Sequence, residues 1–331
     1  LDAIIGNPPY QVMDGGNAAS ALPVYQHFVG LAKTMQPRFI SMITPSRWFA
    51  GGRGLDSYRN DMLSDERIGM LVDFADSQEC FPSVIIGGGI SYFLWSHSHL
   101  GDCCIINRSR GTSNSLVRSL SEFSVFVRSN FAITIIRKIT KQSPLFLSYE
   151  VLPSNPFGFR TYVRGESSPF PGSVRFIHRD GIGYVARTEV EQSTDAIDTF
   201  NVLTTRAMSG GNKPSSDGSY LVIPSTMRVM EAGEICAETY ICIGKMATKI
   251  EAVNLKSYLS TRFVRFLMLQ AMTSIMISKD SFRFVPLEDF IESSEINWDT
   301  PIEEIDKQLY RKYELSESEV QFIESMIKPM T

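Results

Sequence analysis

This sequence of 331 residues lacks the features that mark several classes of protein. It has five cysteines with no CxxC pair and only four histidines, so neither a disulfide framework nor a metal site is indicated. It has no apolar run of roughly 18 residues, which a membrane span requires, and no signal peptide at its N-terminus. These absences predict a cytoplasmic protein without a membrane partner and without a bound metal.

The chain also lacks a large excess of charge of either sign, because it has 32 Lys and Arg against 36 Asp and Glu. The distribution is uneven: residues 101–190 hold twelve basic against six acidic residues, and residues 288–331 hold four against twelve. A local basic surplus suits a groove for a phosphate backbone, and it equally suits a solvated basic face. Charge alone leaves both interpretations open.

What the first 110 residues do contain is an alternation of predicted strands and helices. Strands are expected at 2–6, 39–45, 68–74, 89–96 and 102–108, and helices at 23–35 and 55–66. The first strand is expected to be buried and the last to pair with 89–96 as a hairpin. The alternation predicts a parallel sheet, whose ligands gather at the carboxyl ends of the strands.

The pattern changes after about residue 110 to short apolar runs between Gly and Pro turns, which predict a mixed domain of short strands. The stretch SGGNKPSSDGS (209–219) predicts an exposed loop. Residues 251–272 predict one helix with an apolar stripe. A helical stretch is expected between Pro301 and Tyr313, and another begins where Ser316 and Glu319 have capping-box spacing.

The clearest motif is Asn7-Pro8-Pro9-Tyr10, directly after the first predicted strand. Two prolines end a strand, because neither donates a hydrogen bond to the ladder and each fixes φ. A conjugated amino group is a poor nucleophile, and two acceptors that bind its N–H groups can steer it towards tetrahedral geometry. The Asn7 carboxamide and the Pro8 carbonyl can be those acceptors, and Tyr10 can stack on the ring. A plain strand-ending turn is the alternative.

The strand plus NPPY resembles the catalytic motif of S-adenosyl-L-methionine-dependent amino-methyltransferases, which include adenine-specific DNA methyltransferases of type II (type IIG-like) restriction-modification systems. The segments ITPSRWF, YRNDML, IGMLVDF and CFPSVIIGGGISYFLW follow in the order of the second half of that catalytic domain. ETYICIG, the 251–272 helix, SKDSFRFVPLEDF and LYRKYELSESEVQFIESMI are similar to the family's target-recognition domain and tail. The resemblance thus covers nearly the whole chain.

The resemblance implies an α/β fold, the second half of a Rossmann-like methyltransferase sheet followed by a mixed α+β target-recognition domain. It implies a partial catalytic domain at 1–110, a DNA-binding target-recognition domain at 111–290 and an acidic helical tail at 291–331. It also implies S-adenosyl-L-methionine as cofactor, with Asn7 at its site, and double-stranded DNA as partner. A flipped adenine would lie between Tyr10 and Phe81, although core packing explains Phe81 equally well.

Several basic residues of the second domain are candidate DNA contacts, since Arg suits both phosphates and guanine edges. They are Arg160, Arg164, Arg175, Arg179 and Lys279. The neighbouring aromatic residues Phe157, Phe159 and Tyr162 could read bases, and His178 belongs with them. Each of these residues could equally be structural or solvated.

One departure from the family concerns the cofactor. The family has a glycine-rich loop and an acidic ribose-binding residue on strands that precede NPPY, whereas six residues precede Asn7 here and the first is Leu. The glycines at 87–89 predict a bulge or a close backbone approach rather than a cofactor contact. We therefore expect a fragment or split product, whose partner is the missing N-terminal part, a second subunit or a second copy.

Three functions follow from these patterns. The first is part of a site-specific DNA methyltransferase that acts on the exocyclic amino group of a flipped adenine. The second is a DNA-recognition module without catalysis, because the cofactor pocket is incomplete. The third is an amino-methyltransferase of RNA or protein, against which the long recognition-like region argues.

Overall fold

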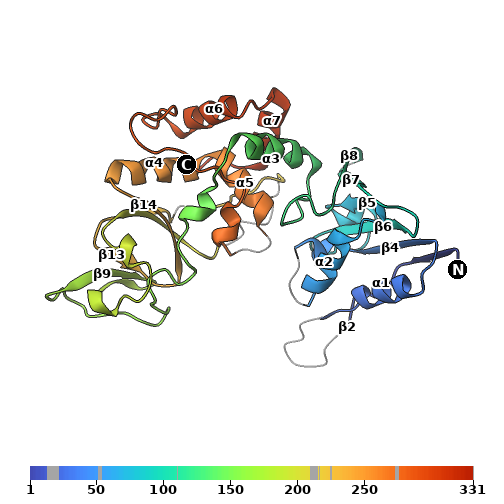
Figure 1. Ribbon diagram of the computed structural model, residues 1–331, viewed down its shortest axis with the longest axis horizontal. Coiled ribbons are helices and arrows are strands. Elements are labelled where there is room, and N and C mark those ends of the chain that lie inside the picture. Colours follow the sequence, from blue (N-terminus) through green and yellow to red (C-terminus); the bar gives the residue numbers. More distant parts are fainter. Residues whose placement is uncertain are drawn as a thin grey trace. The chain divides into compact units, whose positions relative to one another are not determined.

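The structure is a computed structural model that describes residues 1–12, 22–50, 54–109, 111–208, 215, 217–223, 226–272 and 276–330. It divides into two compact units, Leu1–Ile133 and Thr134–Thr331, each described here by itself (Figure 1). Most of the loop predicted at 209–219 lies outside the described residues. No helix in the described ranges is long and apolar enough to cross a membrane.

The first unit is built on a six-stranded sheet. In spatial order its strands are β1 (Ala3–Gly6), β4 (Phe39–Pro45), β6 (Ile90–Ser96), β5 (Ile68–Phe74), β7 (Cys103–Ser109) and β8 (Thr112–Arg118). β1, β4, β5 and β7 run in one direction, while β6 and β8 run in the other. The α/β class with half of a Rossmann-like sheet is confirmed. The expectation of a purely parallel sheet is wrong, because β6 inserts between β4 and β5.

One further expectation for this sheet needs correction. The strand at 102–108 was expected to pair with 89–96, but β7 pairs with β5 and β8 instead, since β5 already separates it from β6. β8 continues the same sheet to Arg118, and the compact unit continues to Ile133.

Helices α1 (Tyr25–Thr34) and α2 (Asp56–Ser64) cover one face of this sheet. Tyr25 and Tyr58 meet edge to face between them, with ring centroids 5.8 Å apart. Trp48, in the short helix η1 (Ser46–Phe49), is fully buried in the same core. The predicted alternation of strand and helix is therefore confirmed, and one apolar core fixes the strand ends that carry the candidate site.

β1 forms one edge of the sheet, which corrects the prediction that residues 2–6 are buried. It pairs with β4 on one side, and no other strand of the described residues pairs with its second side. Ile5 points away from the core and is 82% exposed. The strand is followed by the short hairpin of β2 (Gln11–Val12) and β3 (Leu22–Pro23).

The second unit contains two small sheets, as the short apolar runs predicted. One consists of β10 (Gly181–Ala186), β9 (Ser173–His178) and β13 (Glu234–Cys236), and the other of β12 (Arg228–Met230), β11 (Phe200–Thr205) and β14 (Tyr240–Met246). The predicted run SVRFIHR forms β9, whereas FGFRTYV forms turns.

The predicted helix at 251–272 is two helices, α4 (Lys249–Ser260) and α5 (Arg262–Ala271). Thr261 separates them in an extended conformation, and its hydroxyl caps α5 by accepting from the Val264 N–H. The predicted apolar stripe is buried on both helices. Arg265 on α5 is also fully buried.

The C-terminal segment folds as expected into α6 (Ile302–Lys312) and α7 (Glu317–Met326), and the capping box of Ser316 and Glu319 is present. One helix was not predicted. α3 (Asn130–Gln142) has the sequence NFAITIIRKITKQ, whose β-branched residues favour a strand locally, yet its apolar side chains are buried on a helical face.

Candidate functional site

The NPPY turn lies at the carboxyl end of β1. Pro8 is buried, whereas the side chains of Asn7 and Pro9 are exposed. The Tyr10 carbonyl accepts a hydrogen bond from the Val24 N–H at 3.3 Å, which ties the turn to the start of α1. The two fixed proline φ angles and this hydrogen bond hold the Asn7 carboxamide and the Pro8 carbonyl in a rigid turn.

Tyr10 connects this turn to a second segment of the same unit. Burial and the Cys80 thiol raise the pKa of its phenol and the Asn7 carboxamide lowers it, which together bring the pKa to about 12. The phenol is therefore within electrostatic reach of both Asn7 and Cys80. Its hydroxyl is buried and makes no hydrogen bond of normal geometry with the described residues, so the ring is the part of Tyr10 suited to binding.

Phe81 follows Cys80 in the segment 75–89, which joins the carboxyl end of β5 to the start of β6. Phe81 is half-buried and lies outside the cluster of buried apolar residues that forms the core of this unit. The directions of β1 and β5 bring residues 7–10 and 80–81 to the same sheet edge, although about 70 residues separate them. The resemblance to the methyltransferase family implied that Tyr10 and Phe81 lie on one base, and this pairing stays a prediction.

An ion pair with a buried carboxylate lies at the same end of the sheet, and it was not predicted from the sequence. The Asp73 carboxylate, at the end of β5, accepts from Arg128 Nε at 2.6 Å and Nη2 at 2.7 Å. It also accepts from the Ser46 hydroxyl at 3.0 Å, and Arg128 Nη1 donates to the Gly88 carbonyl at 2.9 Å. The only local signal was an Asp at the end of the apolar run IGMLVDF.

The glycines at 87–89 do what the sequence predicted. Gly88 and Gly89 both have positive φ, and a Cβ on Gly89 would lie 2.3 Å from the Phe74 carbonyl oxygen. Gly89 thus permits a close approach of two backbone segments, and its own carbonyl accepts from the Ser46 N–H. These glycines hold the base of the 75–89 segment.

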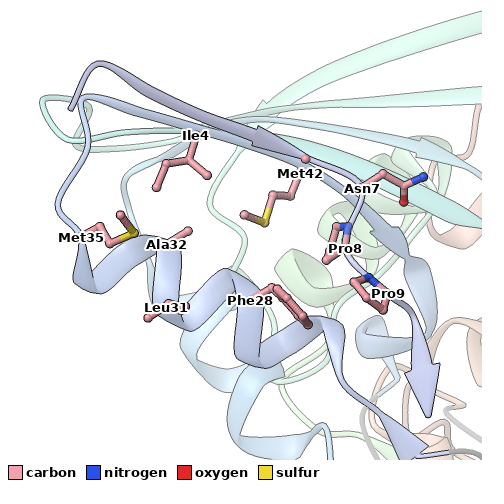
Figure 2. A pocket seen from close by; sticks show the side chains of 10 residues that line it. Ile4, Asn7, Pro8, Pro9, Phe28, Leu31, Ala32, Met35 and Met42 are labelled. Atoms are coloured by element: carbon pink, nitrogen blue, oxygen red, sulfur yellow. The ribbon is translucent and has the colours of Figure 1, made fainter. Parts of the chain in front are cut away.

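An apolar pocket of about 260 Å³ lies between β1 and α1 and is bordered by the NPPY turn (Figure 2). Its lining residues are Ile4, Gly6, Asn7, Pro8, Pro9, Phe28, Leu31, Ala32, Met35 and Met42. Asn7 has the only polar side chain among them, and Figure 2 shows its carboxamide pointing away from the apolar side chains. The pocket and the Asn7 carboxamide therefore lie on different sides of the turn.

Among the described residues, those at this edge do not form a complete site for a nucleoside cofactor such as S-adenosyl-L-methionine. The pocket is smaller than the cavities that enclose ligands of that size. No carboxylate lines it, and the glycines at 87–89 are already engaged with Phe74 and Arg128. Asn7, the expected cofactor contact, borders this pocket with its carboxamide turned away from the apolar lining.

Four of the five predicted DNA-binding residues lie around the β10–β9–β13 sheet, and each pairs with a carboxylate. Arg160 pairs with Glu238 at 2.9 Å, Arg164 with Asp180 at 2.5 Å, Arg175 with Glu234 at 2.6 Å and Arg179 with Asp180 at 3.4 Å. Arg164 also donates to the carbonyls of its own loop, at Thr161 and Val163. These pairs fix the loops, and the partners were not predictable from neighbouring sequence.

The other candidates separate into buried and exposed residues. Phe157 and Phe159 are core residues, and Phe159 packs on Phe176 at 5.0 Å. Tyr162, between them and Arg164, is 78% exposed. Lys279 is exposed at the start of η6 (Lys279–Phe282). His178 is buried and its Nδ1 accepts from the Asp180 N–H.

Comparison with known proteins gives one family match and one curated relative. The family of Eco57I restriction-modification methylases matches residues 1–81, a range that includes both Asn7 and Phe81. Over 145 residues the chain is 34% identical to an uncharacterized adenine-specific methylase of Mycoplasma pneumoniae (strain ATCC 29342 / M129), covering 42% of this chain and 34% of the relative. The match thus spans about a third of the relative's length. The resemblance expected from the motif is confirmed.

Two solved structures are also similar. The type IIL restriction-modification enzyme MmeI in complex with DNA is 11% identical, with a TM-score of 0.37 over 97% of this chain and 56% of that chain. The type IIG restriction endonuclease BpuSI is 10% identical, with a TM-score of 0.35 over 81% of this chain and 42% of that chain.

Proposed function

We propose that this chain is the amine-orienting and target-recognition part of a site-specific DNA methyltransferase of a restriction-modification system. Its substrate would be the exocyclic amino group of an adenine flipped out of double-stranded DNA, and its methyl donor S-adenosyl-L-methionine. The observation that carries the proposal is the direction of the strands: β1 and β5 run the same way, so the rigid Asn7–Tyr10 turn and the Cys80–Phe81 segment leave the sheet at the same end. The matches to restriction-modification and adenine-specific methylases support it.

In this proposal the residues of the turn bind and orient the base. The Asn7 carboxamide oxygen and the Pro8 carbonyl each accept one N–H of the amino group, which draws its lone pair out of conjugation with the ring. The rings of Tyr10 and Phe81 stack on the extruded adenine and offset part of the stacking lost from the duplex. The neutral amine is itself the nucleophile, so the site orients it and needs no general base before attack.

The second unit would carry the recognition of DNA. Arg160, Arg175 and Arg179 keep much of their side chains exposed beside their carboxylate partners, and Lys279 is exposed on η6. These residues are the proposed phosphate or base contacts. Arg164, four residues after Arg160, is proposed with them. We retain 1–110, 111–290 and 291–331 as the proposed functional division into a partial catalytic domain, a recognition domain and a tail.

The open edge of β1 supports the proposal of a protein partner. Phe28, Leu31 and Met35, which line the pocket in Figure 2, are exposed, and so is Ile5 on β1. An exposed strand edge with apolar neighbours favours pairing with another chain segment. The partner would be an N-terminal methyltransferase segment, a second subunit or a second copy of this chain.

A second function, a DNA-recognition module without catalysis, is favoured by one observation: the pocket beside the Asn7–Tyr10 turn is small, and Asn7 has the only polar side chain in its lining. Calorimetry with S-adenosyl-L-methionine and a gel shift with duplex DNA separate the two. Binding of both ligands supports the methyltransferase, and binding of DNA alone supports the module. A preference for RNA, or no binding of duplex DNA, would overturn both.

A further inference from the structure

The segment 75–89 is a loop whose two ends are held together by hydrogen bonds from Arg128. Arg128 donates from Nη2 to the Phe74 carbonyl at one end and from Nη1 to the Gly88 carbonyl at the other. Its charge is balanced by Asp73, whose side chain is buried. Gly89 lies against the carbonyls of Phe74 and Ala75, where a Cβ would clash. The loop therefore leaves and re-enters the sheet at one fixed place.

The interior of the loop is held by its own hydrogen bonds. The Ser77 hydroxyl donates to the Val84 carbonyl at 2.9 Å and accepts from the Ile86 N–H at 2.8 Å. The Phe81 N–H donates to the Ser77 carbonyl at 2.8 Å, and the Val84 N–H to the Phe81 carbonyl at 3.0 Å. These bonds fix the residues around Phe81 as one compact turn.

At the tip of this fixed turn the chain presents aliphatic side chains to solvent. Ile85 is 83% exposed and Val84 is 46% exposed, although the core of the same unit is apolar and close by. An apolar side chain held outward by a rigid loop favours contact with an apolar partner. The loop leaves the sheet at the carboxyl end of β5, and the Asn7–Tyr10 turn leaves it at the same end, because β1 and β5 run in the same direction.

We propose that Ile85, with Val84 beside it, enters the DNA base stack at the place that the target adenine leaves. Extruding a base opens an apolar gap between its former neighbours, and an aliphatic wedge can fill that gap while aromatic rings hold the base outside. Phe81 and Ile85 lie on one turn, so a single loop would stack on the flipped base and support the duplex. This inference rests on the proposed function, because it requires duplex DNA at this edge.

The test measures binding of the protein to a short DNA duplex. Sequencing of cellular DNA first identifies the adenine that is methylated, and the duplex is centred on that adenine. Replacing Ile85 by Ser removes the aliphatic wedge and leaves the fold intact, because the side chain is exposed. Binding to the normal duplex should weaken roughly 10- to 100-fold, the loss that corresponds to burying one such side chain. A duplex with a pyrene nucleotide opposite the adenine fills the gap, and on it wild type and Ile85→Ser should bind equally.

Leu100→Ser is the matched control. Leu100 is 75% exposed, also aliphatic and also in a loop of this unit, but it lies between β6 and β7 at the opposite edge of the sheet. The Leu100→Ser variant should bind both duplexes with the affinity of the wild type. If Ile85→Ser loses the same binding affinity for both duplexes, or loses none for either, the proposal that Ile85 fills the base stack is wrong. The proposed function would still stand. Failure of the wild type to bind DNA overturns both.

Discussion

Arg128 and Asp73 form a bidentate ion pair where β5 ends in the six-stranded sheet, with nitrogen–oxygen distances of 2.6 and 2.7 Å. The Asp73 side chain is only 3% exposed, whereas Arg128 reaches it from outside the sheet and also lies over the Phe49 ring. The pair joins the end of β5 to the loop that carries Phe81. It is therefore the part of the fold on which the geometry of the candidate site most depends.

Replacing Arg128 by Met should lower the free energy of unfolding by about 3–5 kcal/mol, because it leaves the Asp73 carboxylate buried without its partner. Urea denaturation measures this loss. Arg38→Met is the control, since Arg38 pairs with Asp2 at the surface, where an ion pair contributes at most about 1 kcal/mol. Equal effects of the two variants would contradict the role given to Arg128.

Replacing Asn7 by Ala should lower the rate of methyl transfer at least about 100-fold, the usual effect of removing one group directed at the reacting atoms. The thermal midpoint should stay unchanged because the Asn7 side chain is exposed. Gln11→Ala, an exposed amide four residues on, should retain full activity. A lower midpoint, or the same loss of activity in Gln11→Ala, would indicate that the turn is structural.

Tyr10 should act through its ring and not through its hydroxyl. Tyr10→Phe should keep activity, since the buried hydroxyl makes no regular hydrogen bond with the described residues. Tyr10→Ala should weaken binding of target DNA by about 1–3 kcal/mol, the stacking free energy of one base. Fluorescence of 2-aminopurine at the target position reports the extruded base. Loss of function in Tyr10→Phe would place chemistry on the hydroxyl and contradict stacking.

Asp306 should make the stability of the second unit depend on pH. It accepts from the N–H groups of Arg262 and Phe263 at the start of α5, and burial raises the pKa of its carboxyl to about 6. The folded chain then keeps a proton that the unfolded chain has released between about pH 4 and 6. Stability therefore falls as pH rises through this window, by about 2–3 kcal/mol for a shift of this size.

Urea midpoints at pH 4.5 and 7 measure this dependence. Asp306→Asn should remove most of the slope between the two pH values, and Asp299→Asn, at an exposed carboxyl of the same unit, should keep it. A slope in Asp306→Asn equal to that of wild type, or a wild-type stability that rises over the window, would show that Asp306 is not the group responsible.

The sequence predicted those parts of the fold that local patterns determine. Strands with flanking turn residues, helices with a capping residue and the Asn-Pro-Pro turn all depend on residues within a few positions of each other. It was also predictable that the Asn7–Tyr10 turn and the 75–89 segment leave the sheet at the same end, because strands of the same direction end on one side.

The remainder depends on partners distant in the chain. The insertion of β6 between β4 and β5 is determined by packing over the whole sheet. The apolar period continues through Thr261 without interruption, so the break between α4 and α5 left no signal in that pattern. Asp73 finds its partner 55 residues away, and Arg160 finds Glu238 78 residues away. No local pattern specifies such pairs.

The most direct measurement of the central claim is the methylation state of adenine in DNA. The natural open reading frame that encodes this chain, with its neighbouring genes, is expressed in a host without adenine methylation, and the host DNA is sequenced for N6-methyladenine. We predict N6-methyladenine at one recurring sequence, and its disappearance in Asn7→Ala. Unmodified adenine with wild type, or methylation that persists in Asn7→Ala, would contradict the account.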